Sequence, residues 1–141
     1  MLAWREAASE DTVLRETLLL LKRAGITLRE PFRHPAGEEY TLDAGLSGAS
    51  CALADSGTLV VPGGGGRMLQ TSLMAPIHLA VLNAAHIHAT MSEWLSEEGS
   101  ELVIKSPNTV LISGPSRTAD IEMTLTIGMH GPERAVIFCY T

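Results

Sequence analysis

The chain has 141 residues, 45% of them hydrophobic and 18% charged, and its formal net charge is −6. This length is enough for one domain with a packed core, and the composition excludes an intrinsically disordered chain. The excess of acidic side chains argues against general nucleic-acid binding, which needs a basic face for the phosphates. No run approaches the ~18 apolar residues of a membrane-spanning helix, so we expect a soluble protein with no membrane partner.

Apolar periodicity and turn residues predict strands and helices that alternate along the chain. A helix capped by Ser9 and stopped at Gly25 is the first long element. The expected strands cover residues 2–4, 26–28, 42–50, 58–61, 77–82, 109–112 and 135–139. The further expected helices cover residues 51–54, 67–75, 84–98 and 118–127.

Two of the expected strands, 77–82 and 135–139, are almost wholly apolar. Such strands are typical of a mainly parallel sheet that is covered on both faces. The sequence therefore predicts an α/β fold with a mainly parallel sheet. No repeat or internal boundary divides the chain, so a single domain over residues 1–141 is expected.

The two cysteines, Cys51 and Cys139, lie far apart and form no CxxC pair. They cannot hold an iron–sulfur cluster alone, and no cofactor is evident from the sequence. We expect both to be buried small side chains in a reducing compartment. The first residues do not have the pattern of a signal peptide, so we expect a cytoplasmic protein.

The segment 113–122, SGPSRTADIE, joins the strand 109–112 to the expected helix 118–127. Ligands of α/β sheets bind at the carboxyl ends of strands, and a helix N-terminus there suits an anion. This strand-to-helix corner is therefore a candidate site for a small anionic ligand. Gly114 permits close backbone approach, Ser116 and Thr118 supply hydroxyls, and Arg117 can make a bidentate contact.

Helix capping is the alternative explanation for the same corner. Thr118 is a good N-cap, and Asp120 and Glu122 are acids close to the positive end of a helix. Capping leaves Arg117 unexplained, because a cation is unfavourable at that end.

A second polar turn, Asp55 to Thr58, precedes the strand 58–61, and four glycines, Gly63 to Gly66, follow that strand. A glycine run before a helix can cradle phosphate through its backbone amides. The run lacks the GK[ST] ending of a Walker loop, and a mobile hairpin tip explains it equally well.

Three histidines, His78, His86 and His88, lie close together in the sequence. None of them has the spacing of a metal motif, so no metal site is expected. His78 can act as an acid or hydrogen-bond donor, or it can be a core residue.

Three stretches together resemble the LUD-domain family, the lactate-utilisation protein C group. They are ADSGTLV from Ala54, SLMAPIHLAVL over 72–82 and SGPSRTADIEMTLTIGMHGPERAVIF over 113–138. The resemblance covers about residues 42–141 well and residues 1–30 loosely. It implies a fold like the sugar-phosphate isomerase and CoA-transferase superfamily, a three-layer α/β/α sandwich with a mainly parallel sheet. It also implies that the chain lacks the usual N-terminal region of the family.

The resemblance further implies an accessory role in the oxidation of lactate to pyruvate, beside partner proteins that carry iron–sulfur clusters. Ser56 and Thr58 would then line the ligand cleft with the corner residues. One alternative is an independent enzyme with isomerase-like or CoA-transferase-like chemistry. Its acid–base group would come from Asp55, His78, Asp120 or Glu122. Another alternative is a structural interaction module, and the sequence leaves self-association open.

Overall fold

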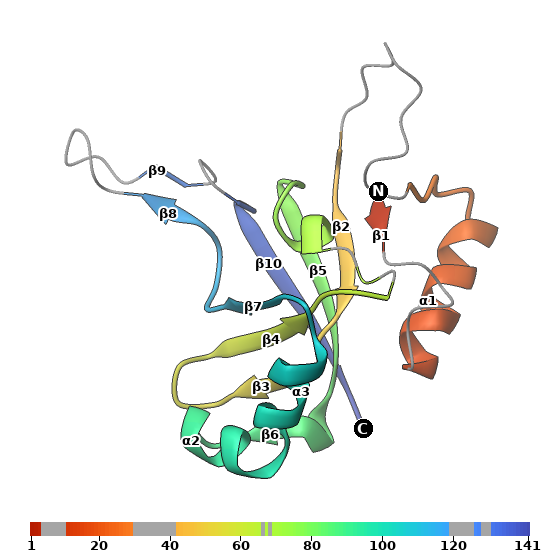
Figure 1. Cartoon of the computed structure of the whole chain (residues 1–141). Helices are drawn as coiled ribbons and strands as arrows, with labels where there is room; N and C mark the ends of the chain where they lie inside the picture. Colours follow the sequence, from red (N-terminus) through yellow and green to blue (C-terminus); the bar gives the residue numbers. More distant parts are fainter. Residues whose placement is uncertain (4–10, 30–41, 66, 68, 119–125, 128–130) are drawn as a thin grey trace.

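The computed structural model describes residues 1–3, 11–29, 42–65, 67, 69–118, 126–127 and 131–141. Two four-stranded sheets form the centre of this part of the chain, and a two-stranded arm extends from them (Figure 1). No helix in the described ranges is long and apolar enough to cross a membrane.

The first sheet, sheet A, is entirely parallel, with the strand order β1-β2-β5-β10. Its long strands are rich in β-branched and aliphatic residues, and this composition favours a parallel sheet between covering layers. The prediction of an α/β fold with a mainly parallel sheet is thereby confirmed. The bounds of the four strands are Leu2–Ala3 for β1, Gly45–Gly48 for β2, Ile77–Asn83 for β5 and Arg134–Tyr140 for β10.

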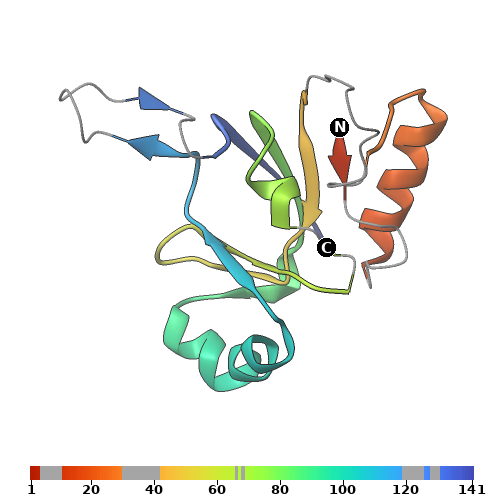
Figure 2. The same ribbon diagram turned by 45° about the horizontal axis from the view of Figure 1, so that its top comes forward.

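Helix α1, Thr12–Arg23, covers one face of sheet A (Figure 2). Leu14 and Leu18 lie one turn apart on the buried side of the helix and join the core of that sheet. The Asp11 carboxylate caps the helix by accepting from the backbone N–H groups of Val13 and Leu14, at 2.8 and 3.1 Å. The predicted cap, Ser9, lies outside the described residues.

The opposite face of sheet A packs against η2, the 3₁₀ turn Leu69–Ser72. Gly45 of β2 makes this close contact possible, because a Cβ at Gly45 would lie 1.7 Å from the carbonyl oxygen of Thr71. Side chains of successive strand residues alternate between faces, so Ser47 and His78 point to the side of η2.

The second sheet, sheet B, has the strand order β6-β3-β4-β7. Its β3–β4 and β4–β7 pairs are antiparallel, and its β3–β6 pair is parallel. The strands are β3 Cys51–Leu53, β4 Thr58–Pro62, β6 Ile87–His88 and β7 Thr109–Ile112.

A continuous helical segment covers one face of sheet B. It begins with α2, Met91–Trp94, passes through the π-helical turn η4, Leu95–Gly99, and ends with α3, Ser100–Lys105. Trp94 packs on this face with Cys51, Leu53 and Val60. We call the segment 91–105 the helical cover.

Several predictions of secondary structure are wrong. Residues 51–53 form strand β3, because they pair with β4 and β6, and Cys51 and Leu53 are buried on one face of the strand. The expected helix 67–75 shrinks to η2, and residues 26–28 belong to no strand. The expected helix 84–98 starts only at Met91, because η3, Ala84–His86, and β6 precede it.

The expected helix 118–127 is also wrong at both ends. Arg117–Thr118 and Thr126–Ile127 form the antiparallel strands β8 and β9, with Arg117 opposite Ile127. The two ends of the segment pair as antiparallel strands, and residues 119–125 between them lie outside the described residues. In Figure 1 these strands form the arm at the upper left.

Candidate functional site

Three hydroxyl groups meet where the β3–β4 turn approaches the end of β7. Thr58 Oγ1 lies 2.8 Å from Ser56 Oγ and 2.7 Å from Ser113 Oγ. The antiparallel register of β4 and β7 pairs Leu59 with Ile112, so it brings Thr58 beside Ser113. Thr58 is buried, whereas Ser56 and Ser113 are exposed. We call Ser56, Thr58 and Ser113 the hydroxyl cluster.

The segment that leaves the hydroxyl cluster leads directly to Arg117. Gly114 has φ +109°, a conformation that L side chains rarely adopt, and it turns the chain away from β7. The backbone N–H of Ser116 donates to the carbonyl of Pro132 at 2.8 Å, which fixes this segment against the chain before β10. Arg117 is exposed on β8.

The corner therefore differs from the expected one. Because residues 117–118 are a strand, no helix N-terminus begins at Thr118, and no helix dipole points at the corner there. The polar groups that the structure brings together are the hydroxyls, with Arg117 on the strand that follows. Of Thr118 only the backbone is described, and Asp120 and Glu122 lie outside the described residues.

Asp55 and His78 occupy separate places. Asp55 is exposed in the β3–β4 turn, and its backbone N–H donates to the carbonyl of Ala89 at 3.1 Å. His78 lies in sheet A and is 1% exposed. Its Nε2 lies 2.9 Å from Ser47 Oγ, and its buried Nδ1 has no hydrogen-bond partner among the described residues.

Burial lowers the pKa of His78 from 6.5 to about 4, because desolvation disfavours the charged imidazole. His78 is therefore neutral near pH 7 and supplies no positive charge for an anion. It is a core histidine with one hydroxyl partner in the described structure.

Gly64 and Gly65 of the glycine run lie in a tight turn, not at a helix start. Gly64 and Gly65 have positive φ values of 90° and 61°, and Gly64 pairs with Arg67. The backbone N–H of Gly63 donates to the carbonyl of Asn108 at 2.7 Å. A Cβ at Gly64 would lie 2.8 Å from the ring of Pro107, so the turn is packed tightly against the start of β7. A phosphate at this turn stays an untested prediction.

The chain also holds a group of possible metal ligands that the sequence did not reveal. Cys51, His88 and Glu98 each offer one ligand atom, and these atoms lie within 4.8 Å of one another. Burial, together with the smaller effect of the negative charge of Glu98, raises the pKa of the Cys51 thiol to about 12. Cys139, by contrast, is exposed on β10, so the expectation that both cysteines are buried is wrong.

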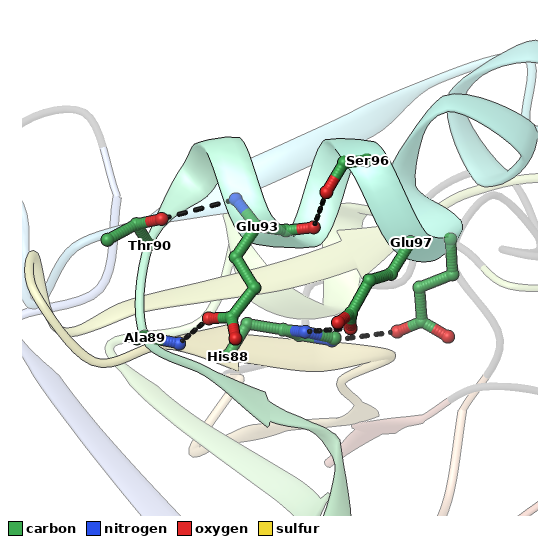
Figure 3. A network of polar contacts seen from close by, with 7 residues as sticks. His88, Ala89, Thr90, Glu93, Ser96 and Glu97 are labelled. Atoms are coloured by element: carbon green, nitrogen blue, oxygen red, sulfur yellow. Dashed lines mark hydrogen bonds and ion pairs between the residues drawn. The ribbon is translucent and has the colours of Figure 1, made fainter.

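Hydrogen bonds at the start of the helical cover hold the chain that follows His88 in place (Figure 3). Thr90 Oγ1 accepts from the backbone N–H of Glu93, and the Glu93 carboxylate accepts from the N–H of Ala89. The pair resembles a capping box, except that the carboxylate accepts from the residue before the N-cap Thr90, and it fixes the chain between β6 and α2.

Two pockets among the described residues lie away from the hydroxyl cluster. One of about 380 Å³ runs between the helical cover and β7, with Trp94 and Leu111 in its wall. Another of about 270 Å³ lies between α1 and sheet A. Both have mainly apolar walls, and neither contains a residue that the sequence predicted as a ligand.

Comparison with known proteins gives matches that agree with the fold. A structure of a DUF162 family protein from Deinococcus radiodurans superposes with a TM-score of 0.60 at 17% sequence identity. The match covers 98% of this chain and 73% of that chain, and it supports the fold.

Similar sequences come from several bacteria. A lactate utilization protein C of Halalkalibacterium halodurans is 35% identical over an alignment of 123 residues, and the match covers 79% of this chain and 50% of that protein. An uncharacterised protein of Neisseria meningitidis serogroup B is 39% identical over an alignment of 98 residues, and the match covers 68% of this chain and 41% of that protein. The chain thus spans half or less of the length of these two curated relatives. The LUD domain family model matches residues 35–139, and the chain belongs to this family.

Proposed function

We propose that the chain is an accessory component of a lactate-utilisation system and binds a small anionic ligand, lactate or pyruvate, beside the hydroxyl cluster. The observation that carries the proposal is the convergence of Ser56, Thr58 and Ser113, with Arg117 on the strand that follows. Relatives that bear the name lactate utilization protein C support the choice of ligand.

The chemistry of the cluster suits a hydroxy acid or a keto acid. A guanidinium binds a carboxylate with two parallel N–H donors, and hydroxyl groups can donate to or accept from the oxygen on the neighbouring carbon. Arg117 would hold the carboxylate, and Ser56 and Ser113 would contact that second oxygen. Gly114 would let the backbone approach the ligand closely. Thr118, whose side chain is not described, would add a further hydroxyl, and Ser116 would position Arg117.

The proposal includes partners. Proteins that carry iron–sulfur clusters would perform the electron transfer of lactate oxidation, and this chain would bind the small acid beside them. An enzyme with isomerase-like or CoA-transferase-like chemistry is the competing hypothesis, and Asp55, Asp120 or Glu122 would then act as its base. No observation on the described residues favours that alternative, because Asp55 is exposed in its turn and His78 lies in sheet A.

Thermal unfolding with a ligand panel tests the proposal. The panel contains lactate, pyruvate, a sugar phosphate and an acyl-CoA, each with the wild type, Arg117→Ala and Arg15→Ala. A ligand at 100 times its dissociation constant stabilises a protein by about 2.7 kcal/mol. We expect lactate or pyruvate to raise the unfolding temperature of the wild type and of Arg15→Ala, but not of Arg117→Ala.

Arg15 is the matched control because it is also exposed, and it lies on α1, away from the arm (Figure 1). Its replacement removes the same charge and leaves the hydroxyl cluster intact. Equal stabilisation of Arg117→Ala and the wild type would contradict the proposed site. Stabilisation by a sugar phosphate or an acyl-CoA alone would favour the enzyme hypothesis.

A further inference from the structure

The group Cys51, His88 and Glu98 lies on sheet B, and the sheet register explains two of its members. β3 and β6 are parallel, with Leu53 opposite His88. Cys51 is two residues before Leu53 on the same strand, so its side chain shares the face of Leu53 and His88. The helical cover packs on that face. The thiol and the imidazole therefore point to the same layer of the structure.

The third member comes from the π-helical turn η4. A π turn adds a residue to a helical turn, and such turns occur frequently at functional sites. Here two consecutive carboxylates reach one imidazole. Glu98 Oε1 lies 3.0 Å from His88 Nε2, and Glu97 Oε2 lies 3.2 Å from His88 Nδ1. Figure 3 shows the side chain of Glu97 directed at the ring of His88.

Gly99 holds this turn in place. A Cβ at Gly99 would lie 2.6 Å from ring atoms of Trp94, so glycine allows η4 to close against the buried indole. The indole in turn packs with Cys51. The position of Glu98 is thus tied to the same packed cluster that holds the thiol.

The donor set is typical of zinc. Cys sulfur, His nitrogen and carboxylate oxygen are all zinc ligands, and sites with three protein ligands leave the fourth position to water or a substrate. Bonds of about 2.0–2.3 Å in a tetrahedron place the donor atoms roughly 3.3–3.6 Å apart. The donor atoms here lie within 4.8 Å of one another, so side-chain movements of about 1 Å complete the geometry.

The surroundings fit as well. Glu97 on Nδ1 is the partner that orients a histidine whose Nε2 binds a metal. Cys51 is buried, His88 is 12% exposed and Glu98 is 44% exposed. The group therefore has a buried thiol end and an exposed carboxylate end, through which an ion can enter.

We propose that Cys51, His88 and Glu98 bind one Zn²⁺ ion, with Glu97 as the residue that positions His88. The ion joins β3, β6 and η4, and so fixes the helical cover to the edge of sheet B. The site is separate from the hydroxyl cluster and does not depend on the proposed ligand.

Cobalt substitution tests the site directly. The full chain is freed of metal by dialysis against EDTA and titrated with Co²⁺, whose bond to a thiolate gives an ultraviolet charge-transfer band. A competing chromophoric chelator then measures the affinity for Zn²⁺. We expect one equivalent of metal, a thiolate band, and displacement of Co²⁺ by Zn²⁺.

Matched variants show whether these side chains, and not other cysteines or histidines of the chain, bind the metal. We expect Cys51→Ser to lose the band and Cys139→Ser to keep it. Glu98→Gln changes a partly exposed side chain and should leave the fold intact, as circular dichroism checks, while the Zn²⁺ affinity falls. Glu97→Gln should weaken Zn²⁺ about 10–100-fold, as changes of orienting partners do. His88→Gln should lose binding, and the exposed His86→Gln should keep it.

Several outcomes overturn the proposal. They are a wild type that takes up no metal, a band that disappears with Cys139→Ser, and a folded Glu98→Gln with unchanged affinity. Loss of lactate binding in the panel described above leaves the zinc site unaffected, because the two sites share no residue.

Discussion

His78 and His88 lie on neighbouring sheets, but their surroundings differ in kind. His78 sits in the core of sheet A with the hydroxyl of Ser47 as its partner, and burial keeps it neutral. His88 sits on sheet B between two carboxylates and close to a buried thiol. The first arrangement stabilises a fold with a neutral ring. The second brings a sulfur, a nitrogen and an oxygen donor close together, and such a group can bind a metal ion.

The largest expected effect comes from Trp94→Ala in the helical cover. Trp94 is 2% exposed, and truncation of such a side chain destabilises a fold by about 3–5 kcal/mol. The loss also frees η4, so we expect Zn²⁺ to stabilise this variant less than the wild type. Urea unfolding with and without Zn²⁺ measures both effects.

Leu18→Ala in α1 is the control for sheet A, because Leu18 is equally buried. It should cost about 2–5 kcal/mol while the stabilisation by Zn²⁺ is retained. If both variants retain the Zn²⁺ effect equally, the helical cover does not support the metal site.

The second effect is the pH dependence that His78 contributes. Its pKa is about 4 in the folded state and 6.5 as the ordinary value, so the unfolded chain binds the extra proton between these limits. Stability from the neutral ring is complete above pH 6.5 and falls as the pH drops towards 4. The loss amounts to about 3 kcal/mol.

Urea unfolding in EDTA at several pH values, with wild type and His78→Gln, measures this contribution. We expect the wild type to lose stability more steeply than the variant between pH 6.5 and 4. Parallel curves for the two proteins would show that His78 is not held neutral by burial.

The third effect is that of Gly99→Ala. The new Cβ would press on the ring of Trp94, and overpacking of this kind costs about 1–3 kcal/mol. We expect a lower unfolding temperature and a weaker cobalt–thiolate band. Gly131→Ala is the matched control, because a Cβ there would lie 3.3 Å from Ser116 Cβ and meet no ring. A band of full strength in Gly99→Ala would argue against the role of η4.

The smallest effect is expected for Ser47→Ala in sheet A. The change leaves Nε2 of His78 without its hydroxyl partner, and an unpaired buried polar atom costs about 1–2 kcal/mol. Ser56→Ala removes an exposed hydroxyl and should change stability by less than about 0.5 kcal/mol. Equal losses in the two variants, measured by urea unfolding, would mean that the Ser47–His78 contact contributes nothing specific.

The two long strands of sheet A could be predicted because long apolar runs with β-branched residues admit few other structures. The runs 77–82 and 135–139 are of this kind, and β5 and β10 follow them closely. The three residues of β3 are too few for a period to show, and their pairing with β4 and β6 decides the structure. Thr118 and Asp120 fit the sequence pattern of a helix N-terminus, but Thr118 pairs with Thr126 in the β8–β9 arm.

The sites divide in the same way. Ser56 and Thr58 could be identified as a polar turn, whereas the partner Ser113 depends on the register of β4 and β7. The possible zinc ligands Cys51, His88 and Glu98 come from β3, β6 and η4. No motif spacing joins them, because the sheet register and a π turn create the site.

X-ray absorption at the zinc edge tests most directly whether the environment of His88, unlike that of His78, binds a metal ion. The full chain is loaded with one equivalent of Zn²⁺. We predict one sulfur neighbour at about 2.3 Å and nitrogen or oxygen neighbours at about 2.0–2.2 Å, with the sulfur absent in Cys51→Ser and present in Cys139→Ser. A shell of nitrogen and oxygen alone in the wild type would contradict the zinc site on sheet B.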